Sequence, residues 1–154
     1  MAFYSRTGTT KRVAEKLAQL LTSDVEEIFD TTNRMGFFNW LRSGRDAGTK
    51  RLTVIRKTEK DPSFYDVVVV GSPVWNSSMS SPVRTYLSQS KGLFKGVAFF
   101  LTSNGSSAND EVFAEMAEVS GKTPVATLAL RKKTVMSEQY DSDLDKFVKD
   151  IMKT

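Results

Sequence analysis

Four valines follow one another at Val67–Val70, inside the segment "YDVVVVG" that spans Tyr65–Gly71. β-Branched side chains favour strands, and a strand that is apolar at every position must be covered on both faces. Strands of this kind lie in the middle of a parallel sheet, between two layers of helices. The run therefore predicts a central, buried strand in a protein of the α/β class.

The rest of the chain alternates between the apolar spacing of strands and that of helices. Strands are predicted at Ala2–Tyr4, Val25–Phe29, Tyr65–Gly71, Gly96–Thr102 and Pro124–Leu130, and Thr53–Arg56 is ambiguous. Apolar stripes predict helices around Val13–Leu21, Phe37–Leu41, Val83–Leu87, Val112–Met116 and Tyr140–Ile151.

Two of these helices begin with recognisable signals. Ser80 and Ser81 precede Pro82, as a hydroxyl cap precedes a proline in the first turn of a helix. Ser107 and Asp110 have the spacing of a capping box. These signals place loops immediately before both helices.

At 154 residues the chain is long enough for one domain and too short for two, so the five strands and their helices are expected to form a single domain over residues 1–154. Right-handed crossovers then give a doubly wound, five-stranded parallel sheet with helices on both faces. Ligands of such sheets bind outside the carboxyl ends of the strands, where the strand order reverses. The loops expected to carry function are therefore Ser5–Thr10, Ser72–Ser81 and Thr102–Asn109.

The absence of two residue types excludes whole classes of chemistry. The chain has no cysteine and no histidine. It therefore has no disulfide, no thiol nucleophile, no Cys-rich or His-rich metal site and no Ser-His-Asp triad. There is also no apolar run of membrane-spanning length and no signal-peptide pattern, so a cytoplasmic protein that does not bind membranes is expected.

Positive charge is concentrated in one part of the chain. Residues 34–60 hold eight bases and two acids, or about +6, although the whole chain carries only +4. A solvated helix face, an acidic partner or an anionic substrate would each explain this segment. No nucleic-acid-binding motif accompanies it, so a nucleic-acid partner is not expected.

The first loop, "SRTGTT", has the composition of a phosphate site. The first N–H groups of a helix lack partners, and the helix dipole favours an anion there. The hydroxyls complete the shell, and Gly8 lets the backbone turn closely around the anion. Neither GxxxxGK[ST] nor GxGxxG is present, so neither a P-loop nor a dinucleotide-binding motif is indicated.

The other two loops have the groups that a flat ring system needs. Trp75 follows the central strand, and its indole offers either a stacking surface or a packing contact for the helix that begins near Pro82. The third loop, "TSNGSSAND", offers uncharged donors and acceptors for the polar edge of a heterocycle.

Together these segments resemble the flavodoxin family. The matching features are the S-x-T-G-x-T pattern from Ser5 to Thr10, the segments "YDVVVVGSPVW" and "FFLTSNG", and a "GFxxxLRSGxDA"-like second helix over Gly36–Ala47. The resemblance covers nearly the whole chain and implies the strand order 2-1-3-4-5. It also implies the cofactor FMN rather than FAD.

Carried over by position, the resemblance assigns three groups of binding residues. The phosphate is assigned to Ser5, Arg6, Thr7, Gly8, Thr9 and Thr10. The ribityl chain and the ring are assigned to Ser72, Pro73, Val74, Trp75 and Asn76. The ring edge is assigned to Thr102, Ser103, Asn104 and Gly105.

The sequence departs from the family in three places. Only Met1–Tyr4 precede the first loop, which implies a short first strand or a start inside a longer chain. Asn76-Ser77 stands where the related branch has Ala-Gly, at a peptide that changes orientation with redox state. The chain is basic, although flavodoxins are typically acidic and dock on basic partners.

Several functions remain open. The resemblance favours an FMN-dependent electron carrier that serves a redox partner protein. Because the chain is basic, an acidic partner is expected, and the carrier itself is expected to be a monomer or a homodimer. The alternative is an NAD(P)H-dependent quinone or flavin reductase, with Phe37, Phe38 and Trp40 lining a substrate pocket. A flavin-free regulatory scaffold is a third class, but a response regulator needs paired carboxylates where Ser5-Arg6 stands.

Overall fold

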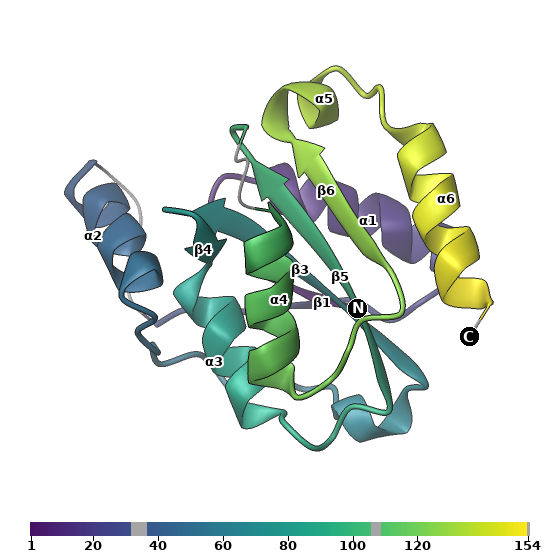
Figure 1. The fold of residues 1–154 in the computed structure, drawn as a ribbon, viewed down its shortest axis with the longest axis horizontal. Helices are drawn as coiled ribbons and strands as arrows, with labels where there is room; N and C mark the ends of the chain where they lie inside the picture. The colour runs from purple at the N-terminus through teal and green to yellow at the C-terminus, as the bar shows by residue number, and fades with distance from the viewer. Residues whose placement is uncertain (32–36, 106–108, 154) are drawn as a thin grey trace.

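The structure, a computed structural model, describes residues 1–31, 37–105 and 109–153, and for residues 37–40 and 42 it describes the backbone alone. A twisted parallel sheet is packed between helices (Figure 1). The strands are β1 (Ala2–Phe3), β2 (Glu26–Glu27), β3 (Val67–Trp75), β4 (Ser78–Met79), β5 (Gly96–Ser103) and β6 (Thr127–Arg131). The helices are α1 (Thr9–Leu21), α2 (Phe37–Gly48), α3 (Ser81–Gln89), α4 (Asn109–Ser120), α5 (Lys132–Met136) and α6 (Asp141–Met152), with a 3-10 turn at Pro62–Phe64.

The strand order is β2-β1-β3-β5-β6, and all of these neighbours are parallel. Because β4 is an extra strand, this is the expected order 2-1-3-4-5, which is thereby confirmed. The order reverses at β1 and β3, where Ala2 pairs with Val70 and Phe3 with Gly71. The loops that follow β1 and β3 therefore emerge side by side at the carboxyl edge.

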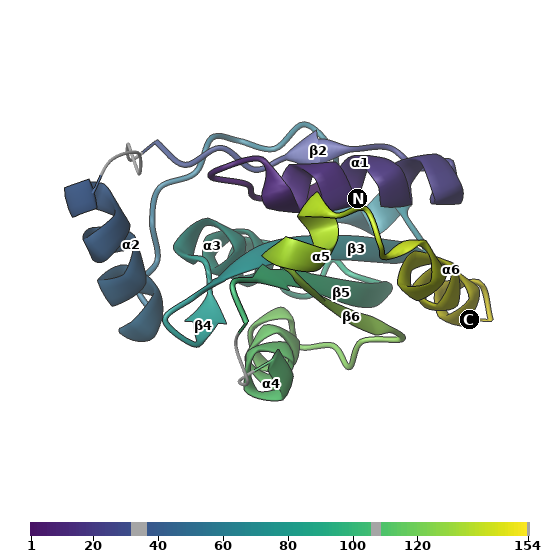
Figure 2. The same cartoon turned by 90° about the horizontal axis from the view of Figure 1, so that it is seen from above.

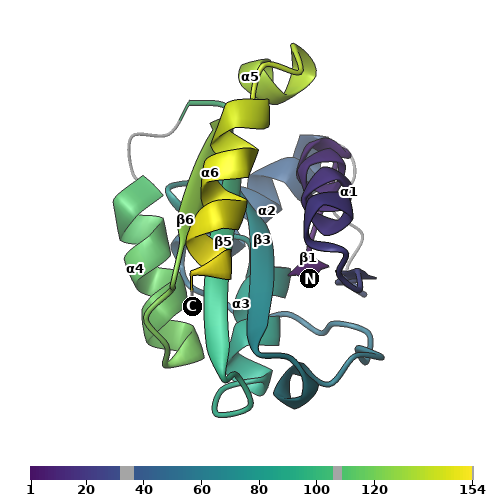
Figure 3. The same ribbon diagram turned by 90° about the vertical axis from the view of Figure 1, so that its right-hand side faces the viewer.

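The valine run sends its side chains into two separate cores. Val68 and Val70 belong to the core beneath α3 and α4, whereas Val69 belongs to the core beneath α1 and α6. Figures 2 and 3 show α1 and α4 on opposite sides of the sheet. The prediction of a central strand covered on both faces is confirmed.

Gly71 follows the four valines in β3, at a point where a neighbouring aromatic ring occupies the space of a side chain. A Cβ at this position would overlap the ring of Phe100, which is fully buried on the neighbouring strand β5. The absence of a side chain at Gly71 therefore makes room for a large aromatic side chain in the sheet.

Several strands and helices differ from the predicted ones. β1 and β2 are shorter than predicted, with two residues each. The ambiguous segment runs beside the end of β2, with an antiparallel bridge between Asp30 and Ile55. The short helix α5 was not predicted, because it has only five residues and therefore too few turns to show a periodic stripe.

The predicted caps have mixed outcomes. Ser80 is the N-cap residue of α3, but its hydroxyl does not cap the helix and instead shares a hydrogen bond with Ser72. Ser107 lies outside the described residues, and Asp110 stands in the first turn of α4. None of the helices in the described parts of the chain is long and apolar enough to cross a membrane.

Candidate functional site

A cavity of about 520 Å³ opens at the carboxyl edge of the sheet, within the usual size range of small-molecule sites. Its wall combines the loop after β1, one side of α2, the end of β3, the loop after β5 and the start of α5. The predicted residues on this wall are Ser5, Arg6, Thr7, Thr9, Thr10, Pro73, Val74, Trp75, Asn76, Thr102, Ser103 and Asn104. The structure thus brings the three predicted segments together, and their contact with a cofactor stays a prediction.

Three of the predicted residues lie off the wall. Ser72 is fully buried, and its hydroxyl donates to the carbonyl of Pro73 at 2.9 Å and accepts from the backbone N–H of Ser80 at 3.0 Å. Gly8 and Gly105 are absent from the lining but have positive φ angles of 87° and 126°. These three residues shape the backbone behind the wall.

The first loop leads directly into α1. Gly8 precedes the helix in a left-handed conformation, and its N–H donates to the hydroxyl of Ser5 at 3.1 Å, which closes the loop. No described side chain caps α1, so the N–H groups of its first turn remain available to a ligand. Because the helix dipole adds partial positive charge there, this end of α1 can hold an anion.

A hydrogen bond joins the first loop to the third. The hydroxyls of Thr10 and Thr102 lie 2.8 Å apart and are buried. Thr10 belongs to the first turn of α1, and Thr102 lies near the end of β5. The bond therefore fixes the start of α1 relative to the sheet.

The second segment is a hairpin rather than a loop. β3 continues to Trp75, the chain turns at Asn76 and Ser77, and β4 runs back antiparallel so that Trp75 faces Ser78. Asn76 and Ser77 have φ angles of 47° and 55°, as a two-residue type I′ turn requires. The usual glycine is missing, so this turn holds two side chains in a strained backbone.

Trp75 lies both in the core and on the wall of the cavity, and its stacking on a cofactor ring stays a prediction. It is 9% exposed and belongs to the core beneath α3, yet it also lines the cavity. Its ring meets Tyr4 edge-on, with centroids 5.5 Å apart and planes at 90°. The guanidinium carbon of Arg6 lies 5.9 Å from the ring centroid, so the indole is held in place from two sides.

A carboxylate on α4 holds the returning arm of the hairpin. Glu115 accepts hydrogen bonds from the Ser78 hydroxyl at 2.7 Å, the Met79 N–H at 3.2 Å and Arg84 at 2.5 Å. Arg84 is buried and also donates to the Ser78 hydroxyl at 3.0 Å. Burial alone would raise the pKa of Glu115, but these hydrogen bonds hold the pKa below its usual value.

Glu115 also connects this hairpin to α2. The ammonium of Lys50, just after α2, lies 3.5 Å from the Glu115 carboxylate. On the facing side of α2, a Cβ at Gly48 would overlap the amide nitrogen of Asn76, and a Cβ at Gly44 would lie 4.0 Å from the Asn76 Cβ. The two glycines therefore form a notch for Asn76, and α2 and the hairpin form one wall.

Sequence reasoning missed several residues of the wall, namely Leu41, Ser43, Gly44, Arg45 and Lys132. Arg45 belongs to the basic segment that the sequence singled out, so the charge pattern was its signal. Lys132 directly follows β6, and the rule that ligands lie beyond the carboxyl ends of strands could have found it. The side chains of Phe37, Phe38 and Trp40, which the reductase alternative uses, lie outside the described residues.

The charged side chains of the described wall are all positive. Arg6, Arg45 and Lys132 contribute three cations, and no aspartate or glutamate appears among its described residues. A negatively charged ligand would therefore be stabilised here, because the described wall has cations that attract it and no carboxylate that repels it.

A family model described as flavodoxin matches residues 1–150. A flavoprotein from Lactobacillus acidophilus NCFM, solved in complex with FMN, is 27% identical with a TM-score of 0.73, and the match covers 96% of this chain and 95% of that chain. A protein from Bacteroides eggerthii DSM 20697 is 24% identical with a TM-score of 0.75 and the same coverage of 96% and 95%, which supports the fold alone. No curated protein matched the chain.

Proposed function

The chain belongs to the flavodoxin family, and on that basis we propose that its cavity binds FMN and that the protein carries electrons between redox partners. One observation carries this proposal. An uncapped helix N-terminus surrounded by hydroxyls and a fixed indole lie on the wall of the same cavity. The similar flavoprotein from Lactobacillus acidophilus NCFM was solved with FMN.

The residues of the first loop fit the phosphate of FMN. The N–H groups at the start of α1 and the hydroxyls of Thr7 and Thr9 are donors to an anion. Hydrogen bonds to a charged acceptor contribute about 1.5–3 kcal/mol each, so a few of them would anchor the phosphate. Arg6 adds a positive charge to the same loop.

The parts of the wall at the ends of β3 and β5 fit a flat, largely neutral ring. Trp75 offers an aromatic surface, and Thr102, Ser103 and Asn104 offer uncharged hydrogen-bonding groups for its polar edge. When bound, FMN supplies reversible transfer of one or two electrons. The protein residues then have to bind and orient the cofactor and limit the access of water.

Electron transfer needs no general acid or base from the protein, and the described wall has no histidine, cysteine or carboxylate to act as one. This composition supports a carrier. The alternative is an NAD(P)H-dependent quinone or flavin reductase, and the three cations on the wall favour it because they would also attract an anionic nucleotide.

Two measurements test the proposal. The purified protein, supplied with FMN, should show the visible absorption bands of a bound flavin, and the flavin released on denaturation should have the mass of FMN. A carrier should keep its oxidised spectrum when NADPH is added without oxygen. Bleaching by NADPH followed by recovery on addition of a quinone would identify a reductase instead, and the absence of flavin binding would refute both functions.

A further inference from the structure

We propose that the electron-transfer partner of this protein is an acidic protein that docks on a basic rim around the cavity mouth. The basic rim consists of Arg6, Arg45 and Lys132, all of which line the cavity. This inference rests on the proposed function, because an electron carrier must bring its cofactor close to the partner. It concerns the identity of that partner, which the cofactor alone does not determine.

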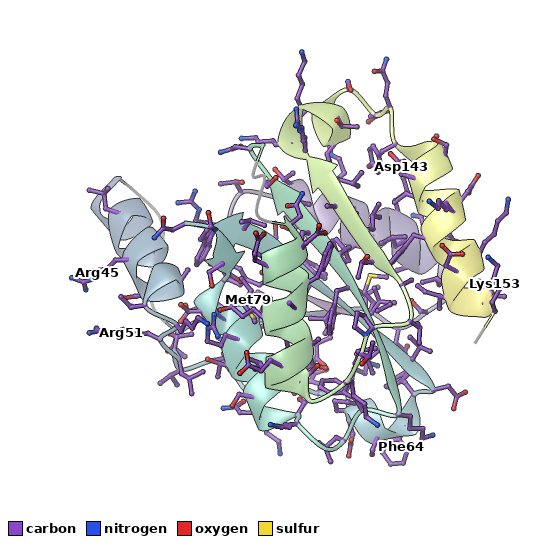
Figure 4. The ribbon with its side chains drawn as sticks, viewed as in Figure 1. Arg45, Arg51, Phe64, Met79, Asp143 and Lys153 are labelled. Carbon is purple, nitrogen blue, oxygen red and sulfur yellow. The ribbon has the colours of Figure 1, made fainter. Side chains whose placement is uncertain are left out.

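The three cations of the basic rim come from separate elements. Arg6 lies in the loop between β1 and α1, Arg45 in α2, and Lys132 at the start of α5. The side chain of Arg45 is 65% exposed, and Lys132 is also exposed. Figure 4 shows Arg45 and Arg51 extending outward at the α2 end of the molecule, far from Asp143 on α6. Positive charge is thus displayed where the cavity opens.

The positive charge of the rim is poorly neutralised by the protein itself. Within the described residues, no carboxylate forms an ion pair with Arg6 or Lys132, and the nearest partner of Arg45 is its neighbour Asp46 at 4.0 Å. Elsewhere on the surface, bases have closer partners, such as Lys11 with Glu27 at 2.9 Å. The rim therefore keeps charge that an approaching acidic surface can neutralise.

The spread of the positive charge favours a protein over a nucleotide. Beyond the cavity wall, further positive charge comes from Arg51 on the α2 side and from Arg131 and Lys133 beside Lys132. A phosphate group needs a few donors at one point, whereas even a weak electron-transfer interface covers up to about 600 Å² on each partner. Cations on both flanks of the opening match the larger footprint.

Charges placed in this way act mainly on the rate of encounter. Opposite charges steer the partner to the cavity mouth and can raise the association rate by about 10 to 1,000-fold at low salt. Salt screens this attraction, because the Debye length falls from about 30 Å at 0.01 M to about 10 Å at 0.1 M. The salt dependence of electron transfer is therefore a direct readout of the sign of the docking charge.

The test uses two redox proteins of opposite charge as probes. In anaerobic stopped-flow experiments, a reduced acidic ferredoxin donates to the oxidised holoprotein, and the reduced holoprotein donates to basic cytochrome c. We expect the bimolecular rate with ferredoxin to fall at least tenfold between 0.01 M and 0.3 M salt. The rate with cytochrome c should instead rise with salt.

Two charge reversals locate the effect on the rim. Arg45→Glu and Lys132→Glu should each lower the low-salt rate with ferredoxin about tenfold, with each rate expressed per bound flavin. A factor of this size lies within the range expected for steering charges. The matched control is Lys95→Glu, which makes the same charge change just before β5, at the opposite edge of the sheet. This control should leave the ferredoxin rate within twofold of the original.

Three results would overturn the proposal. A ferredoxin rate that does not fall with salt would mean that no positive surface guides docking. An equal loss in Lys95→Glu would assign the effect to net charge rather than to the rim. If the rim variants keep the ferredoxin rate but need more NADPH for reduction, the rim serves a nucleotide. Failure of FMN binding would be seen beforehand as a missing visible spectrum, so it is distinct from all three.

Discussion

The carboxylate of Glu115 in α4 accepts a hydrogen bond from the backbone N–H of Met79 in β4, at 3.2 Å. A helix on one face of the sheet thus holds the returning arm of a hairpin whose outgoing arm carries Trp75. Because Lys50 reaches the same carboxylate, the position of α2 is tied to it as well. Glu115 is not on the cavity wall, yet it positions two parts of that wall.

Glu115→Gln should destabilise the fold and weaken flavin binding together. The amide keeps one acceptor but removes the negative charge beside the buried Arg84, and hydrogen bonds to charged groups contribute about 1.5–3 kcal/mol. Urea denaturation should show a loss of this size in the free energy of unfolding, and a flavin titration should show weaker binding. Glu118→Gln, an exposed control on the same helix, should change the stability by no more than about 0.5 kcal/mol.

The same carboxylate makes part of the stability depend on pH. Burial opposes ionisation of Glu115, but the hydrogen bonds from Ser78, Arg84 and Met79 prevail and hold its pKa below the usual value. Its contribution is therefore present above the pKa of the unfolded chain, about 4.3, and is lost as the pH falls through the folded pKa. The stability difference from Glu115→Gln should be constant between pH 5 and pH 7 and shrink below about pH 4. A difference that grows in acid would contradict this assignment.

Gly48→Ala should displace the side chain of Asn76. The added Cβ would overlap the Asn76 amide nitrogen, which lies at the flexible end of a side chain and can move away. We expect weaker flavin binding in Gly48→Ala and little further loss in the double variant Gly48→Ala with Asn76→Ala, because the clash is then absent. A double-mutant cycle on FMN affinity measures this coupling, and strictly additive effects would show that the notch is unimportant.

Gly8→Val should weaken FMN binding through the backbone. A Cβ at Gly8 would meet no atom within 4 Å, but φ is +87°, which a β-branched residue adopts only with strain. Gly8→Asn should keep more affinity, since asparagine tolerates the left-handed region. Gly92 has the same conformation, with φ of +88° and open space around it, but follows α3 away from the cavity. Gly92→Val is therefore expected to lower stability without changing FMN affinity.

Trp75→Ala should restore flavin fluorescence and weaken binding. An indole against the ring would quench its emission, and aromatic pairs contribute roughly 0.5–1.5 kcal/mol beyond the area that they bury. Fluorescence titration of FMN measures both effects. Unchanged quenching and affinity would mean that Trp75 serves only the packing against Tyr4 and the core.

The buried sheet was predictable from sequence because the valine run and the alternating periods are strong local signals. The hairpin was not, since Asn76-Ser77 lacks the glycine that usually marks a two-residue turn. Ser72 could not be separated from the serines around it, because its burial depends on the return of β4 to place Ser80 beside it. Lys132 could have been found from the rule that ligands lie beyond the carboxyl ends of strands. The notch that Gly44 and Gly48 form for Asn76 depends instead on how α2 packs against the hairpin, which a single-sequence pattern does not place in space.

The shortness of β1 has a consequence for the dynamics of the cavity. β1 joins β3 through two register pairs, whereas β3 and β5 share seven. Local opening follows the weakest pairing, so the amides of β1 should exchange with deuterium before those of β5. Since the loop that begins at Ser5 follows β1 directly, each such opening would also loosen the phosphate end of the cavity. The rate at which the cofactor escapes and the rate of amide exchange at Phe3 would then report the same fluctuation.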